Sequence, residues 1–359
     1  MQRYNSANLD TLISNCIYGY YIKYDRLTQL INAEFYNSNS TEIYVYIDLQ
    51  DILRHVDRYI MNTKIPITNV LALTAGVINM VAHYRNFLAT RYQCKSKFWI
   101  IDSIDNVIAR KMCSEFSVTP LSVNMQQIYN MNMEFLGSLC QYIYDVQYER
   151  TEVDFVTKAL HINEIENRNI HTNDPALLIT KDPFSFQACM YPEAYILRPK
   201  KNATGDVSTI VTRKTAVFDY MKEISKDAQL IGPIQIEQLS MLMALSRVPS
   251  RHLKTICNLK SAQTALCNAY RNMATRDYIW DLNQFVDILE KSNRGRFKNL
   301  DQIRYRYMAC EAVRYQDNAY NSLPESKTYN GIVNLYDPKG VQSINNEYFK
   351  DCPLDLNVL

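Results

Sequence analysis

The chain has 359 residues, of which 47% are hydrophobic and 21% are charged, and its formal net charge is +2. This length and composition exclude a disordered or fibrous protein and predict a sizeable core, in one large domain with an appendage or in two modest domains. The net charge alone says little about partners, so the distribution of charge along the chain matters more.

Cysteine usage indicates the compartment. The 9 cysteines stand singly, without a C-x-x-C pair, and the N-terminus "MQRYNSANLD" lacks the features of a secretory leader. We therefore expect a cytoplasmic protein, or one of another reducing compartment, that is not secreted. The 5 histidines are also dispersed, which argues against a zinc site, and no apolar run is long enough to predict a membrane span.

The first part of the chain predicts helix followed by strand. Residues 1–40 carry apolar positions at helical spacing up to a break at "YNSNS", and we expect a helical N-terminal extension there. The β-rich run Ile43 to Ile47 follows and ends at Asp48, as expected of a central strand. Residues 70–92 then carry a helical pattern.

Two further apolar strands also end in an acid. The apolar strand within "KFWIIDSID" ends at Asp102. The apolar run within "ALLITKDPFSFQ" ends at Thr180 and Lys181 and leads to Asp182, before a proline stops the pairing. A single strand-end Asp is most often a helix cap or turn residue. Because the carboxyl ends of parallel strands share one edge of a sheet, three such residues, Asp48 among them, predict a shared acidic site.

Between the second and third strands, residues 104–149 are predicted to form a helical insertion above the sheet. The methionines at its apolar positions are what ordinary core packing would require. The insertion runs into "ERTEVDFVTKAL", where Glu152 and Asp154 lie two residues apart at an expected helix N-terminus. These carboxylates either complement the helix dipole or point into the acidic site.

The strongest charge asymmetry lies between Gln238 and Arg276, a stretch without Asp or Glu. It is expected to form helix, loop, helix, turn and a last helix that begins near Ser261. Helix N-terminal amides with neighbouring lysines make a phosphate-binding surface, and a solvated basic face is the alternative. Further on, "KSNRGRFKNLDQIRYRY" adds basic and aromatic residues, which favours nucleic-acid binding.

In the order of these parts, the chain resembles the flap endonuclease and 5′-to-3′ exonuclease family of the PIN-like nuclease superfamily. The motifs are "YVYIDLQDIL", "FWIIDS", "TEVDFV" and, in the basic region, "LKTICNLKSAQTAL", between about Tyr44 and about Val313. The resemblance implies an α/β fold with a central, mostly parallel sheet flanked by helices. It further implies a nuclease core at 41–230 with an arch at about 104–149, a basic helical region at 231–320 similar to a helix three-turn helix motif, and an extended tail at 321–359.

The resemblance also implies roles for individual residues. Ligands for Mg or Mn would be Asp48, Asp102, Glu152, Asp154 and Asp182. Two cations at the base of the arch, Arg110 and Lys111, would steady the scissile phosphate. The DNA-binding residues would be Arg247, Arg251, Lys254, Lys260 and Ser261.

The sequence departs from the family at the second metal. Phe184 stands where the family has the second acid of an Asp-x-Asp, and "SRVPSRH" lacks the acid expected before the basic turn. Two-metal hydrolysis clamps the attacking and leaving oxygens, and magnesium binds poorly without carboxylates. We therefore expect one ion rather than two, or none if the site is degenerate.

Three hypotheses stay open. The first is a Mg- or Mn-dependent 5′-to-3′ exonuclease or flap endonuclease acting on DNA duplexes with a single-stranded 5′ end or flap. The second is a catalytically degenerate nuclease-fold protein, a DNA-binding or structural component of a larger assembly, with the tail at 321–359 contacting a protein partner. The third is a scaffold protein whose α/β pattern resembles the family by chance.

Overall fold

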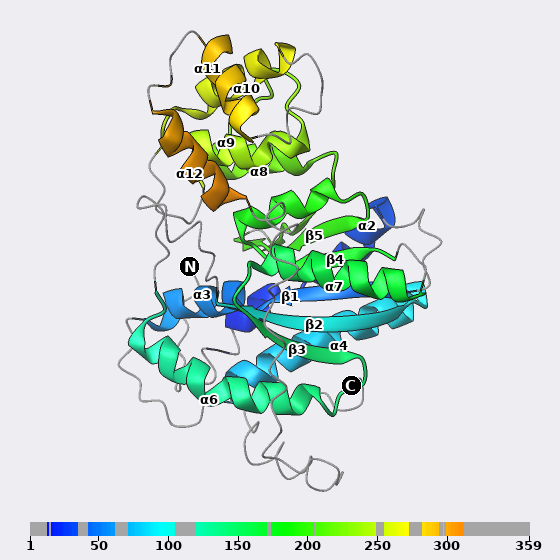
Figure 1. The fold of residues 1–359 in the computed structure, drawn as a ribbon. Helices are drawn as coiled ribbons and strands as arrows, with labels where there is room; N and C mark the ends of the chain where they lie inside the picture. Colours follow the sequence, from blue (N-terminus) through cyan, green and yellow to red (C-terminus); the bar gives the residue numbers. More distant parts are fainter. Residues whose placement is uncertain are drawn as a thin grey trace, which may run out of the picture.

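The computed structural model describes residues 13, 16–34, 42–61, 71–104, 120–170, 174–203, 205–248, 255–272, 282–293, 297 and 299–311. It has a central sheet with helices on both faces and a group of helices beyond one end of the sheet (Figure 1). The predictions at Arg110, Lys111, Arg251 and Lys254 and in the tail at 321–359 lie outside the described residues.

The six-stranded sheet has the order β3-β2-β1-β4-β5-β8. Its strands are β1 (Glu42–Asp48), β2 (Lys95–Ser103), β3 (Val146–Thr151), β4 (Ala176–Ile179), β5 (Ala194–Arg198) and β8 (Thr209–Val211). The first five strands in this order run parallel, and β8 is antiparallel to β5. A separate hairpin joins β6 (Lys201–Asn202) to β7 (Gly205–Asp206). The expected α/β fold with a mostly parallel sheet is confirmed.

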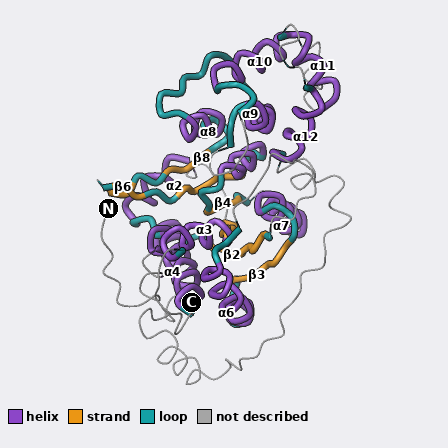
Figure 2. Tube along the Cα trace, turned by 90° about the vertical axis from the view of Figure 1, so that its left-hand side faces the viewer, coloured by secondary structure: helices purple, strands orange, loops and turns teal. Residues whose placement is uncertain are grey.

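Helices cover both faces of this sheet. Those that pack on one face are η1 (Tyr18–Tyr20), α2 (Tyr24–Glu34), α3 (Leu49–Ile60), α4 (Ala72–Tyr92) and α6 (Val123–Cys140). Those on the other face are α7 (Phe155–Ile170), η2 (Pro183–Met190) and α8 (Ala216–Ile224). The strands lie between α4 and α6 on one side and α7 on the other (Figure 2).

The apolar runs of the sequence account for this three-layer arrangement. Along β1, Val45 and Ile47 belong to the core that contains α3, α4 and α6, whereas Tyr44 and Tyr46 belong to the core that contains α7 and η2. A parallel strand buried on both faces must be apolar at successive positions, so its sequence shows no alternation.

The predicted insertion at 104–149 is helical only in part. Within it, α6 is described, whereas 105–119 lie outside the described residues. The pattern missed β3, which begins at Val146 and pairs with β2. As the edge strand of the sheet, β3 has polar residues at its exposed positions, and its sequence "VQYERT" therefore shows no apolar run.

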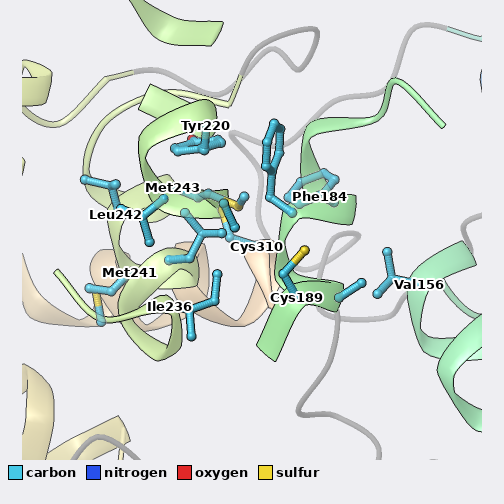
Figure 3. Close-up of a cluster of buried hydrophobic side chains, with 14 of the residues drawn as sticks. Val156, Phe184, Cys189, Tyr220, Ile236, Met241, Leu242, Met243 and Cys310 are labelled. Carbon is cyan, nitrogen blue, oxygen red and sulfur yellow. The ribbon is translucent and has the colours of Figure 1, made fainter. Parts of the chain in front are cut away.

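The helices beyond the sheet continue its core. They are η3 (Ile236–Gln238), α9 (Leu239–Leu245), α10 (Leu259–Arg271), α11 (Leu282–Ser292) and α12 (Leu300–Cys310). One cluster of buried apolar side chains extends from Leu178 of β4 through Phe186 of η2 to Leu242 of α9 and Leu266 of α10. Figure 3 shows part of this cluster between η2, α8 and α9. The C-terminal helices thus share a hydrophobic core with the sheet.

Two composition-based expectations can be compared with the described residues. Every cysteine described is a free thiol. Within the same ranges, no helix has the length and apolar character that crossing a membrane requires.

Candidate functional site

The carboxyl ends of β1 and β4 meet at Asp48. This residue ends β1 and caps α3, because its Oδ1 accepts a hydrogen bond of 3.0 Å from the backbone N–H of Asp51. Its Oδ2 accepts a bond of 2.9 Å from the Thr180 hydroxyl, which directly follows β4. Asp48 is therefore tied to both neighbouring elements by its own side chain.

Asp51 is a site residue that the sequence reasoning missed. It lies in the first turn of α3, and its Oδ2 accepts hydrogen bonds from the Tyr20 hydroxyl at 2.9 Å and the Lys181 backbone N–H at 2.7 Å. Burial, followed by the negative charges of Asp51 and Asp182, raises the pKa of Asp48 well above its usual value. The spacing "DLQD", which places one acid at the cap and a second in the first turn of the same helix, was the available signal.

Asp102 is fully buried and surrounded by hydrogen-bond donors. Its Oδ1 accepts a hydrogen bond of 2.7 Å from the Gln50 side-chain amide. Its Oδ2 accepts bonds from the Tyr129 hydroxyl at 2.6 Å and the Tyr148 hydroxyl at 2.8 Å, and lies 3.9 Å from Nε of Arg150. Donors from α3, α6 and β3 therefore occupy both oxygens of this carboxylate.

The remaining predicted ligands lie in three different settings. Glu152 is exposed, whereas Asp154 is buried and accepts a hydrogen bond of 2.9 Å from the backbone N–H of Val156, in the first turn of α7. Asp182 caps η2, because its Oδ1 accepts the backbone N–H of Phe184 at 3.0 Å. Its Oδ2 lies 3.9 Å from Nη1 of Arg54.

Phe184 has a role of its own in the core. Its side chain is 1% exposed and belongs to the apolar cluster that joins η2 to α8 and α9 (Figure 3). The side chain at the position where the resembled family has its second acid thus points into the hydrophobic core, and this side chain contributes no polar group to the strand-end site.

These observations test whether the predicted acids fit a divalent ion. Magnesium requires several oxygen ligands in near-octahedral geometry. Within the described ranges, no three His, Cys, Asp or Glu side chains come together in a group that could hold a metal ion. Protein donors occupy both oxygens of Asp102, and Glu152 is exposed. The five predicted ligands, as the fold arranges them, do not fit a shared metal site.

A cleft of about 1100 Å³ is lined at the strand ends by Asp51 and Asp182, and Asp182 is the one predicted ligand in its lining. The cations that line it are Arg54, Arg58, Lys181, Arg198, Lys200, Lys222 and Lys226. The acids that line it are Asp51, Asp57, Asp182, Asp219 and Glu223. The lining contains more cations than acids, and such a concave surface attracts anions.

Arg198 holds the loop after β4 in place. Its Nη2 donates to the carbonyl oxygen of Lys181 at 2.8 Å, and its guanidinium lies 4.5 Å from the ring centroid of Phe186. It also pairs with Glu223 of α8 at 3.4 Å. This buried arginine is part of the wall of the cleft and fixes the backbone on which Lys181 and Asp182 stand.

Lys181 is a half-buried cation of the cleft wall. Its Nζ lies 3.7 Å from the ring centroid of Tyr20. Burial lowers its pKa to about 8, and the charges of Arg58, Arg198 and Lys201 act in the same direction while Asp51 opposes them. The neighbouring His55 has its pKa lowered to about 3 by burial and by Lys181 and Arg58, so its imidazole is neutral at physiological pH.

A second, smaller pocket of about 550 Å³ lies at the start of α10. Arg247 and Lys260 line it, and both are exposed. The backbone N–H of Ser261 donates to Oδ1 of Asn258 at 2.8 Å, so the helix cap already uses the amide that was expected to contact phosphate. The two cavities share Ile224 at the end of α8, which places them side by side.

Two arginines of the second basic cluster, Arg304 and Arg306, lie within the described residues and contact other parts of the protein. Arg306 is 1% exposed and donates to the carbonyl oxygen of Ala244 at 2.8 Å. Arg304 pairs with Asp287 and Asp301, each at 3.1 Å. Arg306 is therefore buried within the helical group and does not face nucleic acid, which corrects the expectation for this residue. Arg304 is half-buried, and its partners Asp287 and Asp301 are exposed, so nucleic-acid contact by Arg304 stays a prediction.

The fold and site define a class: an α/β protein with a mostly parallel six-stranded sheet, acids at its strand ends and a cation-lined cleft beside them. No protein-family model and no curated protein matches the sequence. Among solved structures, human GEN1, crystallised in complex with Holliday junction DNA, is similar at a TM-score of 0.40 and 12% identity. The match covers 77% of this chain and 60% of that chain. At these values, the similarity does not extend to function or to individual residues.

Proposed function

We propose that the chain is a nuclease-like protein that binds, or acts on, branched or 5′-ended DNA. The observation that carries this proposal is the excess of cations along the cleft at the carboxyl edge of the sheet, where open α/β sheets bind their ligands. Cations in a concave surface neutralise phosphates, and this sequence-independent term dominates affinity for DNA.

The arrangement of the two cavities supports a duplex as the ligand. Arg247 and Lys260 line the pocket at the start of α10, and Lys222 and Lys226 line the adjoining part of the cleft. Contacts of this kind position a DNA backbone without reading its sequence. The proposed surface therefore runs from the strand ends, past α8, to α10.

Hydrolysis of the DNA would be an additional property, beyond binding. A Mg- or Mn-dependent exonuclease or flap endonuclease would require Asp48, Asp102, Glu152, Asp154 and Asp182 to gather around an ion. The bonds that hold Asp102 and the burial of Phe184 instead favour the second candidate, a nuclease-like protein that binds DNA without cutting it. Such a protein would work within a larger assembly, for which the tail at 321–359 is the candidate partner segment.

Incubation of the pure protein with a labelled 5′-flap DNA in Mg²⁺, in Mn²⁺ and in EDTA tests both candidates. Retarded DNA without cleavage in either metal would support the non-hydrolytic protein. Cleavage that Asp182→Asn abolishes would establish the enzyme, because Asp182 lines the cleft, whereas Asp102 is fully buried. A protein that binds neither the flap nor a blunt duplex in any of these conditions would overturn the proposed function.

The role of the α10 pocket has its own test. Lys260→Glu should weaken duplex binding and reduce the dependence of affinity on salt, because one phosphate contact is lost. Unchanged affinity and salt dependence would show that this pocket is not part of the DNA surface.

A further inference from the structure

The acids at the strand ends have protein cations as their partners. Asp182 faces Arg54 across 3.9 Å, and the Lys181 side chain, which lines the same cleft, is near enough to Asp51 for the two charges to interact. Arg58 lines the cleft one turn along α3 from Arg54. At this edge, protein side chains thus supply positive charge where an isolated acidic cluster would require a divalent ion.

We propose that this cleft binds the phosphates of a nucleic-acid backbone through Arg54 and Lys181 without a divalent metal, and that Asp102 is a structural carboxylate. The inference rests on the proposed function for its ligand. It goes beyond that function in naming the groups that replace a metal.

The hydrogen bonds of Asp102 support its assignment as a structural carboxylate. Gln50 comes from α3, Tyr129 from α6 and Tyr148 from β3, and all three donate to this one side chain at 2.6–2.8 Å. These three donors fill most of the about four acceptor positions of the carboxylate, and only Oδ1 could accept a further ligand without displacing one of them. A buried hydroxyl or amide without a partner is costly, and Gln50 and Tyr129 are both buried, so the network stabilises the carboxylate in its present orientation.

The positions of Arg54 and Lys181 support the proposal that these two side chains bind phosphate. The pair of Arg54 with Asp182 is longer than a hydrogen bond, so it is an electrostatic contact that leaves the guanidinium fork suited to bidentate phosphate recognition. Lys181 presents a compact charge from a backbone that Arg198 and Asp51 hold by hydrogen bonds. Both side chains line one cavity, within which a single phosphate could be contacted from α3 and from the loop after β4.

Fluorescence anisotropy of a labelled 5′-flap DNA, measured in EDTA and again in Mg²⁺, tests whether Arg54 and Lys181 bind the DNA without a metal. The affinity of the unmodified protein should be equal in the two conditions to within about twofold. Arg54→Ala and Lys181→Met should each weaken binding about fivefold or more in EDTA, as expected for a lost charge-assisted contact. Lys95→Met is the matched control, because Lys95 is an exposed cation at the start of β2, the opposite edge of the sheet, and its loss should change affinity little.

The outcomes separate this inference from the function on which it rests. Binding that disappears in EDTA and returns with Mg²⁺ would overturn metal independence and leave DNA binding intact. Equal weakening by Lys95→Met and by the cleft variants would show that only overall charge matters. No binding under any condition would overturn the proposed function itself.

Thermal unfolding with Mn²⁺ alone tests whether Asp102 is a structural carboxylate. The melting temperature should be the same with and without Mn²⁺, and Tyr129→Phe and Tyr148→Phe should each lower it in both conditions. A rise with Mn²⁺ that Asp102→Asn removes, with the variant still folded, would show that Asp102 ligates a metal and would refute the assignment.

Discussion

Replacement of Asp102 by alanine should destabilise the fold far more than replacement of its fellow ligand candidate Glu152. The Asp102 carboxylate, which is 0% exposed, accepts hydrogen bonds from the buried Gln50 and Tyr129 and from the half-buried Tyr148. Hydrogen bonds to charged groups contribute about 1.5–3 kcal/mol each, although values for a shared acceptor do not add fully.

The expected loss for Asp102→Ala is about 4 kcal/mol, because three donors lose their acceptor at about 1–3 kcal/mol each and the losses do not add fully. Glu152 is exposed, so Glu152→Ala should change stability by no more than about 0.5 kcal/mol. Urea unfolding followed by circular dichroism measures both. For an m value of about 4 kcal/mol/M in a chain of this size, the midpoint of Asp102→Ala should fall by about 1 M.

The reasoning fails if the two alanine variants unfold at the same urea concentration. It also fails if Asp102→Ala shifts the midpoint but Tyr129→Phe and Tyr148→Phe leave it unchanged. In that case the hydroxyl donors would not be what holds the carboxylate.

Three further predictions concern the core, the cleft and the α10 pocket. Phe184→Asp should lower stability by more than about 4 kcal/mol and should not create a metal site, because the side chain is 1% exposed in an apolar cluster. Phe218→Asp, at a position 42% exposed, is its control in urea unfolding, and equal effects would contradict the burial argument. Lys181 has a pKa lowered to about 8 and is charged below that pH, so DNA affinity measured by anisotropy should fall between about pH 7 and 9. The same fall in Lys181→Met would assign it to another group. Arg247→Glu, at the exposed rim of the α10 pocket, should weaken binding to all duplex sequences alike, and sequence-dependent loss would contradict a backbone contact.

The sequence alone predicted the layout that brings the strand ends together. Apolar runs that end at Asp48 and Asp102 and in the loop before Asp182 indicated parallel strands, and β2, β1 and β4 are indeed neighbours in the sheet. These features are local, because burial on both faces of a strand appears directly in consecutive residues. The start of α10 was predictable for the same reason, since Asn258 caps it through a bond to Ser261 three residues on.

Tertiary structure decided what each acid does. Partners of Asp102 stand 27, 46 and 52 residues away along the chain, so no local pattern could reveal that its oxygens are occupied. The same holds for Phe184, which packs against helices encoded later in the chain, and for Arg306, a basic residue that α12 buries against α9. Residue type specifies the chemistry a side chain can perform, but only the packing of distant elements determines whether it faces donors, solvent or the core.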